Sequence, residues 1–149
     1  MQVEYSLLLK QAEALLSSET DFIANAANLS ALIFNNMVSV NWAGFYFLQH
    51  DELVLGPFSG QVACTRIAAG AGVCGTAFAT QKTLLVADVH QFEGHIACDV
   101  ASRSEVVVPF TSERLSGVLD IDSPNKNQFT DIDKQFYQQI TAIYLEACA

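Results

Sequence analysis

SEVVVPFTSERLSGVLDIDS, residues 104–123, is the stretch that decides the predicted fold. Its two halves, 104–112 and 115–123, are rich in β-branched and aliphatic side chains, which favour strands. Residues 113–114 lie between them as a two-residue turn. The stretch is therefore predicted to form a tight antiparallel β-hairpin.

The register of this hairpin places three carboxylates on one face. Glu105 is expected opposite Asp122, and Val107 opposite Asp120; because side chains alternate along a strand, all three acids point the same way. Like charges facing each other cost a few tenths to about 1 kcal/mol when exposed. Burial raises this cost unless a cation or a shared proton relieves it. Two interpretations follow: a solvated acidic face or, favoured by the apolar residues between the acids, a functional site.

The composition limits the class of protein. The 149 residues suit one domain, and with 51% hydrophobic and 15% charged residues a disordered chain is excluded. A net charge of −9 argues against a nucleic-acid partner. No apolar run has the roughly 18 residues of a membrane span, and no secretory signal pattern stands at the N-terminus. We expect a cytoplasmic protein without a membrane partner.

The remaining pattern predicts an α+β fold. Helices are expected at both ends of the chain, packed on one face of a mostly antiparallel sheet, in a single domain over residues 1–149. In a first hairpin at 41–58, Trp42 and Tyr46 share one face and Phe45 lies on the other. The other predicted elements are helices at 5–16, 21–37 (Phe22, Ala26, Leu29 and Ile33 inward) and 73–81, a strand at 84–86, a loop at 88–103, and a terminal helix capped by Thr130 or Asp131.

The cysteines allow three interpretations. In the cytoplasm they are reduced by default and are catalytic, metal-binding or simply buried. Zinc would need Cys64, Cys74 and Cys98 together with His90 or His95, but the closely spaced ligand pair typical of structural zinc is missing. Four small buried side chains are the second interpretation.

The third interpretation is a redox pair. Cys64 and Cys98 each follow an alanine in a polar, loop-like segment, so both could be accessible. His95 is close to Cys98 in sequence and could assist proton movement. Cys148, at the end of the last helix, is expected either to serve packing or to belong to a frayed helix end.

Residues 41–133 resemble the free methionine-(R)-sulfoxide reductases, a family built on a single GAF domain. The resemblance is carried by NWAGFYFL, VACTRI, GVCGTA, GHIACD, GVLDIDS and FTDID. It implies that Cys98 is the catalytic cysteine, Cys64 the main resolving cysteine and Cys74 an auxiliary one.

The resemblance also assigns the substrate site. Glu105, Asp120 and Asp122 would bind the substrate and supply the proton, with Glu105 and Asp122 taking part in catalysis, and Trp42 and Tyr46 would enclose the methyl sulfoxide end. A carboxyl beside a carboxylate can hold a proton near neutral pH. The remaining negative charge would attract the α-ammonium of a free amino acid.

The predicted activity is therefore thiol-dependent reduction of free L-methionine (R)-sulfoxide, with no metal and no cofactor. A sulfenic acid on Cys98 would condense with Cys64 to a disulfide, which a thioredoxin-like reductant would reduce. The alternative is a non-catalytic GAF module that senses a small ligand. A homodimer is left open.

Overall fold

The computed structural model describes residues 4–95 and 101–149, and in these ranges it has four α-helices, a short 3₁₀ helix and a six-stranded sheet. No helix in the described ranges is both long and apolar enough to cross a membrane. The elements in chain order are α1 Tyr5–Leu16, α2 Phe22–Asn36, β1 Trp42–Gln49, β2 Glu52–Gly60, β3 Arg66–Ala68, α3 Gly72–Thr80, β4 Leu84–Val86, η1 Val89–Gln91, β5 Ser104–Thr111, β6 Ser116–Ser123 and α4 Asp131–Ala147.

The sheet has the order β3-β2-β1-β6-β5-β4, and every neighbouring pair is antiparallel. The hairpin register predicted from the sequence is confirmed: Glu105 pairs with Asp122 and Val107 with Asp120. The turn closes through the Ser112 amide, which donates to the Leu115 carbonyl. Because β1 and β6 lie side by side at the centre, they carry side chains into the middle of both faces.

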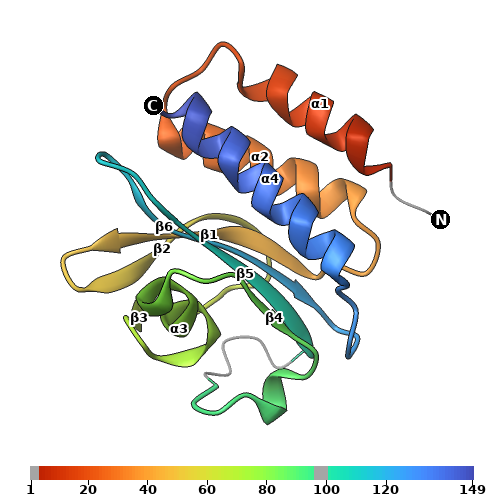
Figure 1. Cartoon of the computed structure of the whole chain (residues 1–149), viewed down its shortest axis with the longest axis vertical. Coiled ribbons are helices and arrows are strands. Elements are labelled where there is room, and N and C mark those ends of the chain that lie inside the picture. Colours follow the sequence, from red (N-terminus) through yellow and green to blue (C-terminus); the bar gives the residue numbers. More distant parts are fainter. Residues whose placement is uncertain (1–3, 96–100) are drawn as a thin grey trace.

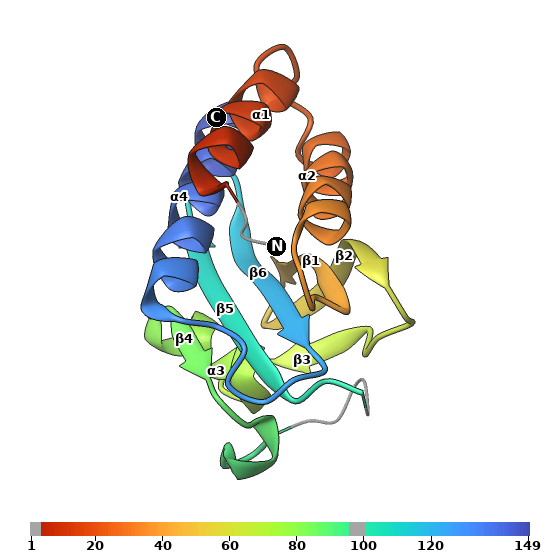
Figure 2. The same ribbon diagram turned by 90° about the vertical axis from the view of Figure 1, so that its right-hand side faces the viewer.

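One face of the sheet is covered by α2 and α4, and α1 packs on the outside of these two helices (Figures 1 and 2). The core on this face includes Phe45, Leu119 and Ile121. Both long helices have N-caps: Asp21 accepts the amide of Ala24, and Thr130 forms a capping box with Asp133.

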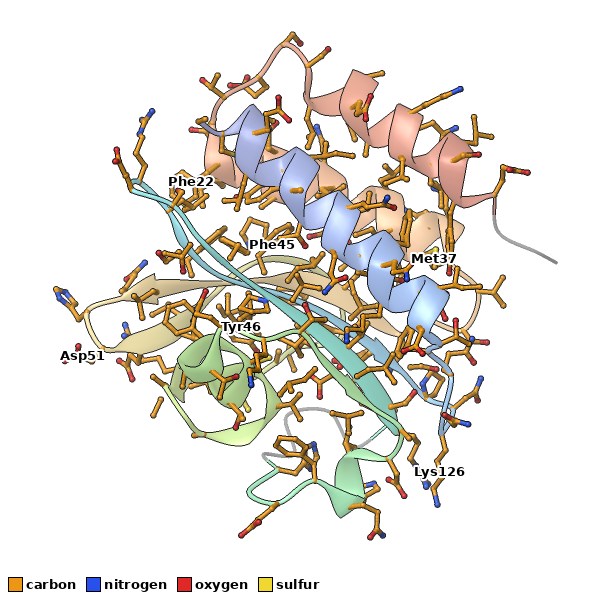
Figure 3. The ribbon with its side chains drawn as sticks, viewed as in Figure 1. Phe22, Met37, Phe45, Tyr46, Asp51 and Lys126 are labelled. Carbon is orange, nitrogen blue, oxygen red and sulfur yellow. The ribbon has the colours of Figure 1, made fainter. Side chains whose placement is uncertain are left out.

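The opposite face is covered by α3 and the loops around it (Figure 1). Figure 3 shows the two directions on one strand: Phe45 points toward the long helices and the neighbouring Tyr46 toward α3. The N-terminal and C-terminal helices lie on one face as predicted, and α3 adds a second, smaller layer.

Two details differ from the prediction. Phe22 was expected to point inward, but 39% of it is exposed, because it begins α2 at the rim and meets Phe47 edge to face. The predicted loop at 88–103 contains the 3₁₀ helix η1, capped by Asp88.

Strands β1 and β6 approach unusually closely at Gly117. A Cβ at this position would overlap the backbone oxygen of Tyr46 and would lie 3.0 Å from the Cα of Phe47. A glycine within a strand often marks such an approach of two backbones. The absence of a side chain at Gly117 thus sets the distance between the central strands beside Tyr46.

Candidate active site

A small cavity of about 50 Å³ lies between the sheet and α3. The residues around it come from β1, β3, β5, β6, α3 and three connecting segments, so it forms only when distant parts of the chain pack together. It is lined by Trp42, Tyr46, Ala63, Ile67, Ala71, Gly72, Val73, Cys74, His95, Ser102, Glu105, Asp120 and Asp122.

Three carboxylates form the sheet side of this cavity. Glu105, Asp120 and Asp122 are only 7%, 5% and 8% exposed. A solvated acidic face would leave such groups open to water, so that interpretation of the hairpin is wrong. Among the described residues, Oδ1 of Asp120 is buried without a hydrogen-bond partner. An acceptor in this state is available to a donor from a bound ligand.

The ionisation of the three carboxyl groups is linked. Burial raises the pKa of Glu105 well above its ordinary value, and the neighbouring charges of Asp120 and Asp122 raise it further. Burial also raises the pKa of Asp120, while hydrogen bonds with Glu105, Asp122 and Cys74 partly oppose that rise. The protons of such a group titrate together rather than one residue at a time. Burial and the neighbouring charges therefore favour a proton on this group of carboxyls above the ordinary carboxyl pKa.

Cys74 faces the carboxyls from the first turn of α3. Its thiol Sγ lies 3.8 Å from Oε2 of Glu105, within reach of a weak S–H···O hydrogen bond. Burial, and then Asp120, Glu105 and Asp122, raise the pKa of this thiol well above its ordinary value. Because the thiolate is the reactive form, Cys74 is a poor nucleophile in this arrangement, and its role as an auxiliary resolving cysteine stays a prediction.

Trp42 and Tyr46 form the aromatic wall of the cavity. Their ring centroids are 6.0 Å apart, and Phe58 stacks on the outer side of Trp42 at 5.2 Å. Trp42 Nε1 donates to the Gln61 carbonyl at 3.0 Å, and the Tyr46 hydroxyl donates to the Cys64 carbonyl at 2.9 Å. Burial and the nearby acids raise the pKa of Tyr46, so this hydroxyl keeps its proton.

The cysteines fall into different environments. Cys64 is disulfide-bonded and half-buried, whereas Cys74 and Cys148 are free and buried. Cys98, the predicted catalytic residue, lies outside the described residues. Cys148 belongs to the core under the long helices, where Asn25 Nδ2 contacts its Sγ at 3.7 Å. Cys148 thus has the packing role predicted for it.

The donor atoms of Cys74, Glu105 and Asp120 lie within 4.8 Å of one another, and among the described residues this group has the spacing to hold a metal ion. The zinc set considered from the sequence is different, because it required Cys64. A cysteine in a disulfide has no thiolate to offer a metal.

Two polar residues at the cavity were not assigned a substrate role from the sequence. Ser102 lines it and accepts a hydrogen bond from Asn41 Nδ2 at 3.4 Å. His95 also lines it, and its pKa is lowered by burial and by His90, whose ring centroid is 5.9 Å away. The sequence marked His95 only as a neighbour of Cys98. Ser102 carried no signal beyond standing shortly before Glu105.

Residues 24–147 match the family model of the GAF domain. Free methionine-R-sulfoxide reductase of Escherichia coli (strain K12) is 50% identical over 139 residues, which span 93% of this chain and 84% of that protein.

Two solved structures resemble the chain over nearly all of its length. The structure of fRMsr of Staphylococcus aureus in complex with substrate has a TM-score of 0.94 and 48% identity, covering 100% of this chain and 98% of that chain. Free methionine-R-sulfoxide reductase from Neisseria meningitidis, also in complex with its substrate, has a TM-score of 0.92 and 43% identity, covering 97% and 87%. With the family model and these identities, the chain belongs to the GAF domain family and, within it, to the free methionine-R-sulfoxide reductases.

Proposed function

We propose that this protein reduces free L-methionine (R)-sulfoxide to methionine. The observation that carries the proposal is the group of three buried carboxyls, which shares one small cavity with the aromatic wall of Trp42 and Tyr46. The Escherichia coli relative is named for this activity. The (R) preference rests on the names of the relatives.

The cluster of three carboxyls suits the protonation of the sulfoxide oxygen. A sulfoxide oxygen leaves poorly until it is protonated, so a thiol at sulfur and an acid at oxygen are needed together. Glu105, whose pKa is raised, is the proposed acid, and the charge shared by Asp120 and Asp122 is the proposed partner of the substrate ammonium. A methionine sulfoxide inside a polypeptide has no such ammonium, which supports a preference for the free amino acid.

Cys98 is the proposed nucleophile. In the net step, its thiol takes the oxygen from the substrate sulfur, which gives a sulfenic acid and methionine. The thiol of Cys64 then condenses with the sulfenic acid, forming an S–S bond and water. Support for Cys64 as the resolving residue comes from its disulfide-bonded state and from Cys74 and Cys148 being free.

A thioredoxin-like dithiol is the proposed reductant that returns both thiols and becomes a disulfide itself. The cytoplasm, where such reductants hold thiols reduced, is the proposed compartment.

Four substrates test the function: the (R) and (S) epimers of methionine sulfoxide, each free and within a peptide. With a dithiol present, we expect methionine release from the free (R) epimer alone. Saturable binding of that epimer without release of methionine would instead identify a sensing GAF module. Equal turnover of the peptide would contradict the proposed role of the ammonium.

Cys98→Ser tests the nucleophile, with Cys148→Ala as the control in the core under the long helices. We expect no methionine release from the first variant and wild-type release from the second. Full activity of Cys98→Ser would show that another residue attacks the sulfoxide.

A further inference from the structure

The segment that carries Cys64 has no regular secondary structure. Residues 61–65, here called the Cys64 segment, connect the end of β2 to the start of β3. Val62 within it is 84% exposed. Apart from the disulfide of Cys64, hydrogen bonds tie this segment to the sheet.

Three carbonyl groups of the Cys64 segment accept such bonds. The Thr65 carbonyl accepts the amide of Leu55 at 2.9 Å, which is an ordinary backbone contact with β2. The other two accept from side chains: Gln61 from the indole of Trp42 at 3.0 Å, and Cys64 from the hydroxyl of Tyr46 at 2.9 Å. The cysteine is thus held by the same two residues that form the aromatic wall of the cavity.

Both side chains are fixed well enough to act as anchors. Trp42 is buried, stacks on Phe58 with an angle of 14° between the rings, and lies over two glycines. A Cβ at Gly44 would come within 2.8 Å of its ring, and one at Gly60 within 2.7 Å. Tyr46 is buried among Val107, Val118 and other members of the same cluster.

We infer that Trp42 and Tyr46 are positioning residues for Cys64, in addition to lining the substrate cavity. Their ring faces meet the cavity, and their N–H and O–H groups fix the backbone on either side of the resolving thiol. The hydrogen bond from Tyr46 therefore sets how fast the Cys64 thiol reaches a sulfenic acid. This inference rests on the proposed function in naming Cys64 as the resolving residue.

The test separates the two chemical steps in Tyr46→Phe, which keeps the ring and removes the hydroxyl. Fully reduced enzyme is mixed with one equivalent of free methionine (R)-sulfoxide, without reductant. Methionine release reports oxygen transfer to the thiol, and the loss of two hydrogens by intact mass, once water has left, reports the disulfide. A sulfenic-acid trap such as dimedone reports the intermediate.

We expect Tyr46→Phe to slow disulfide formation about fivefold more than it slows methionine release, the order expected for one neutral hydrogen bond. Trapped sulfenic acid should rise accordingly. Trp42→Phe, which removes the bond to Gln61, should shift the same ratio in the same direction. A role confined to the substrate cavity would slow methionine release without slowing the disulfide step, which would overturn the inference.

Tyr137→Phe is the matched control. Tyr137 is also a buried tyrosine, but it lies under the long helices and its hydroxyl has no hydrogen-bond partner among the described residues. It should leave the ratio of the two rates at the wild-type value. If Tyr46→Phe matches it, the inference fails even where methionine is released normally.

A second arm uses hydrogen peroxide in place of the sulfoxide. Peroxide oxidises a thiol to a sulfenic acid and becomes water, and the Cys64 thiol then condenses with that acid and releases a second water. A slow disulfide step in Tyr46→Phe here would support the positioning role even if the wild type released no methionine. Methionine release therefore tests the proposed function, and the rate of the disulfide step after peroxide tests this inference separately.

Discussion

The face of the sheet under α1, α2 and α4 and the face under α3 are built from alternate residues of the same strands. In β6, Leu119 and Ile121 point to the long helices, while Asp120 and Asp122 point to the cavity. The first pair is fully buried among apolar side chains. The second pair is buried together with a third acid. Alternation along one strand therefore separates the residues that stabilise the fold from those proposed for chemistry.

The energetic difference between the two faces is large. Burying Leu119 or Ile121 stabilises the fold by about 1.5–3 kcal/mol each. Burying a carboxyl next to another carboxyl does the opposite unless one of them keeps its proton. Apolar burial, such as that of Leu119 and Ile121, must therefore offset the cost of the buried carboxyls.

The largest effect is expected from Glu105→Gln on the cavity face. It should lower kcat/KM for methionine release by about 10²–10⁴, the usual contribution of a general acid, while circular dichroism shows an intact fold. The control is Glu113→Gln, an exposed acid in the turn of the same hairpin, which should keep wild-type activity. Activity retained by Glu105→Gln would move the role of the acid to Asp120 or Asp122.

The next effect is expected on the opposite face. Leu119→Ala should lower the free energy of unfolding by about 2–5 kcal/mol, because it leaves a cavity in the apolar core. Denaturant titration measures it, and the exposed Val62→Ala should stay within about 0.5 kcal/mol of wild type. If the variant were as stable as wild type, the helical face would not be the main source of stability.

The third prediction concerns the pH dependence of stability, which is expected to come from Glu105 on the cavity face. The folded state raises the pKa of Glu105 above its ordinary 4.5, so it binds protons that the unfolded chain has released. The stability from the protonated group is present below pH 4.5 and is lost as the pH rises through the raised pKa, by up to about 1.4 kcal/mol per pH unit for each proton. Unfolding titrations from pH 4 upward should give a flatter curve for Glu105→Gln. Parallel curves for the two proteins would mean that Glu105 ionises as it does in the unfolded chain.

The smallest effect is expected at the helical layer, away from the cavity. Thr130→Ala removes the capping box of α4 and should cost about 1 kcal/mol of unfolding free energy. The kinetics should not change, since Thr130 does not line the cavity. Thr80→Ala, at the exposed end of α3, should alter stability by less than about 0.5 kcal/mol. A kinetic effect of Thr130→Ala would show that the two faces are coupled.

The hairpin register and the residues on each face could be predicted from the sequence because they follow from local rules. A two-residue turn fixes the pairing of its strands, and the pairing fixes which side chains meet. Glu105 and Asp122 were placed correctly in this way, and so was the side of β1 that carries Trp42 and Tyr46. Their roles in substrate binding and catalysis stay predictions.

Other parts of the site depend on how distant elements pack, which no local pattern records. The contact of Cys74 with Glu105 exists only because α3 packs against the sheet face opposite the long helices. The bond from Tyr46 to Cys64 joins a strand to a segment without periodicity. Phe22 fits the apolar stripe of α2, but the sequence pattern does not reveal that this end of the helix lies at the edge of the core, where Phe22 is partly exposed.

Gly117 shows that the position of Tyr46 at the cavity depends on a residue of the neighbouring strand. It is not among the residues that line the active-site cavity and has no ionisable group, yet a single methyl there would meet the backbone of Tyr46 and force β1 and β6 apart. A screen of all substitutions would therefore find intolerance at a position remote from any reacting atom. At such a position, the fold requires the lack of a side chain rather than any particular group.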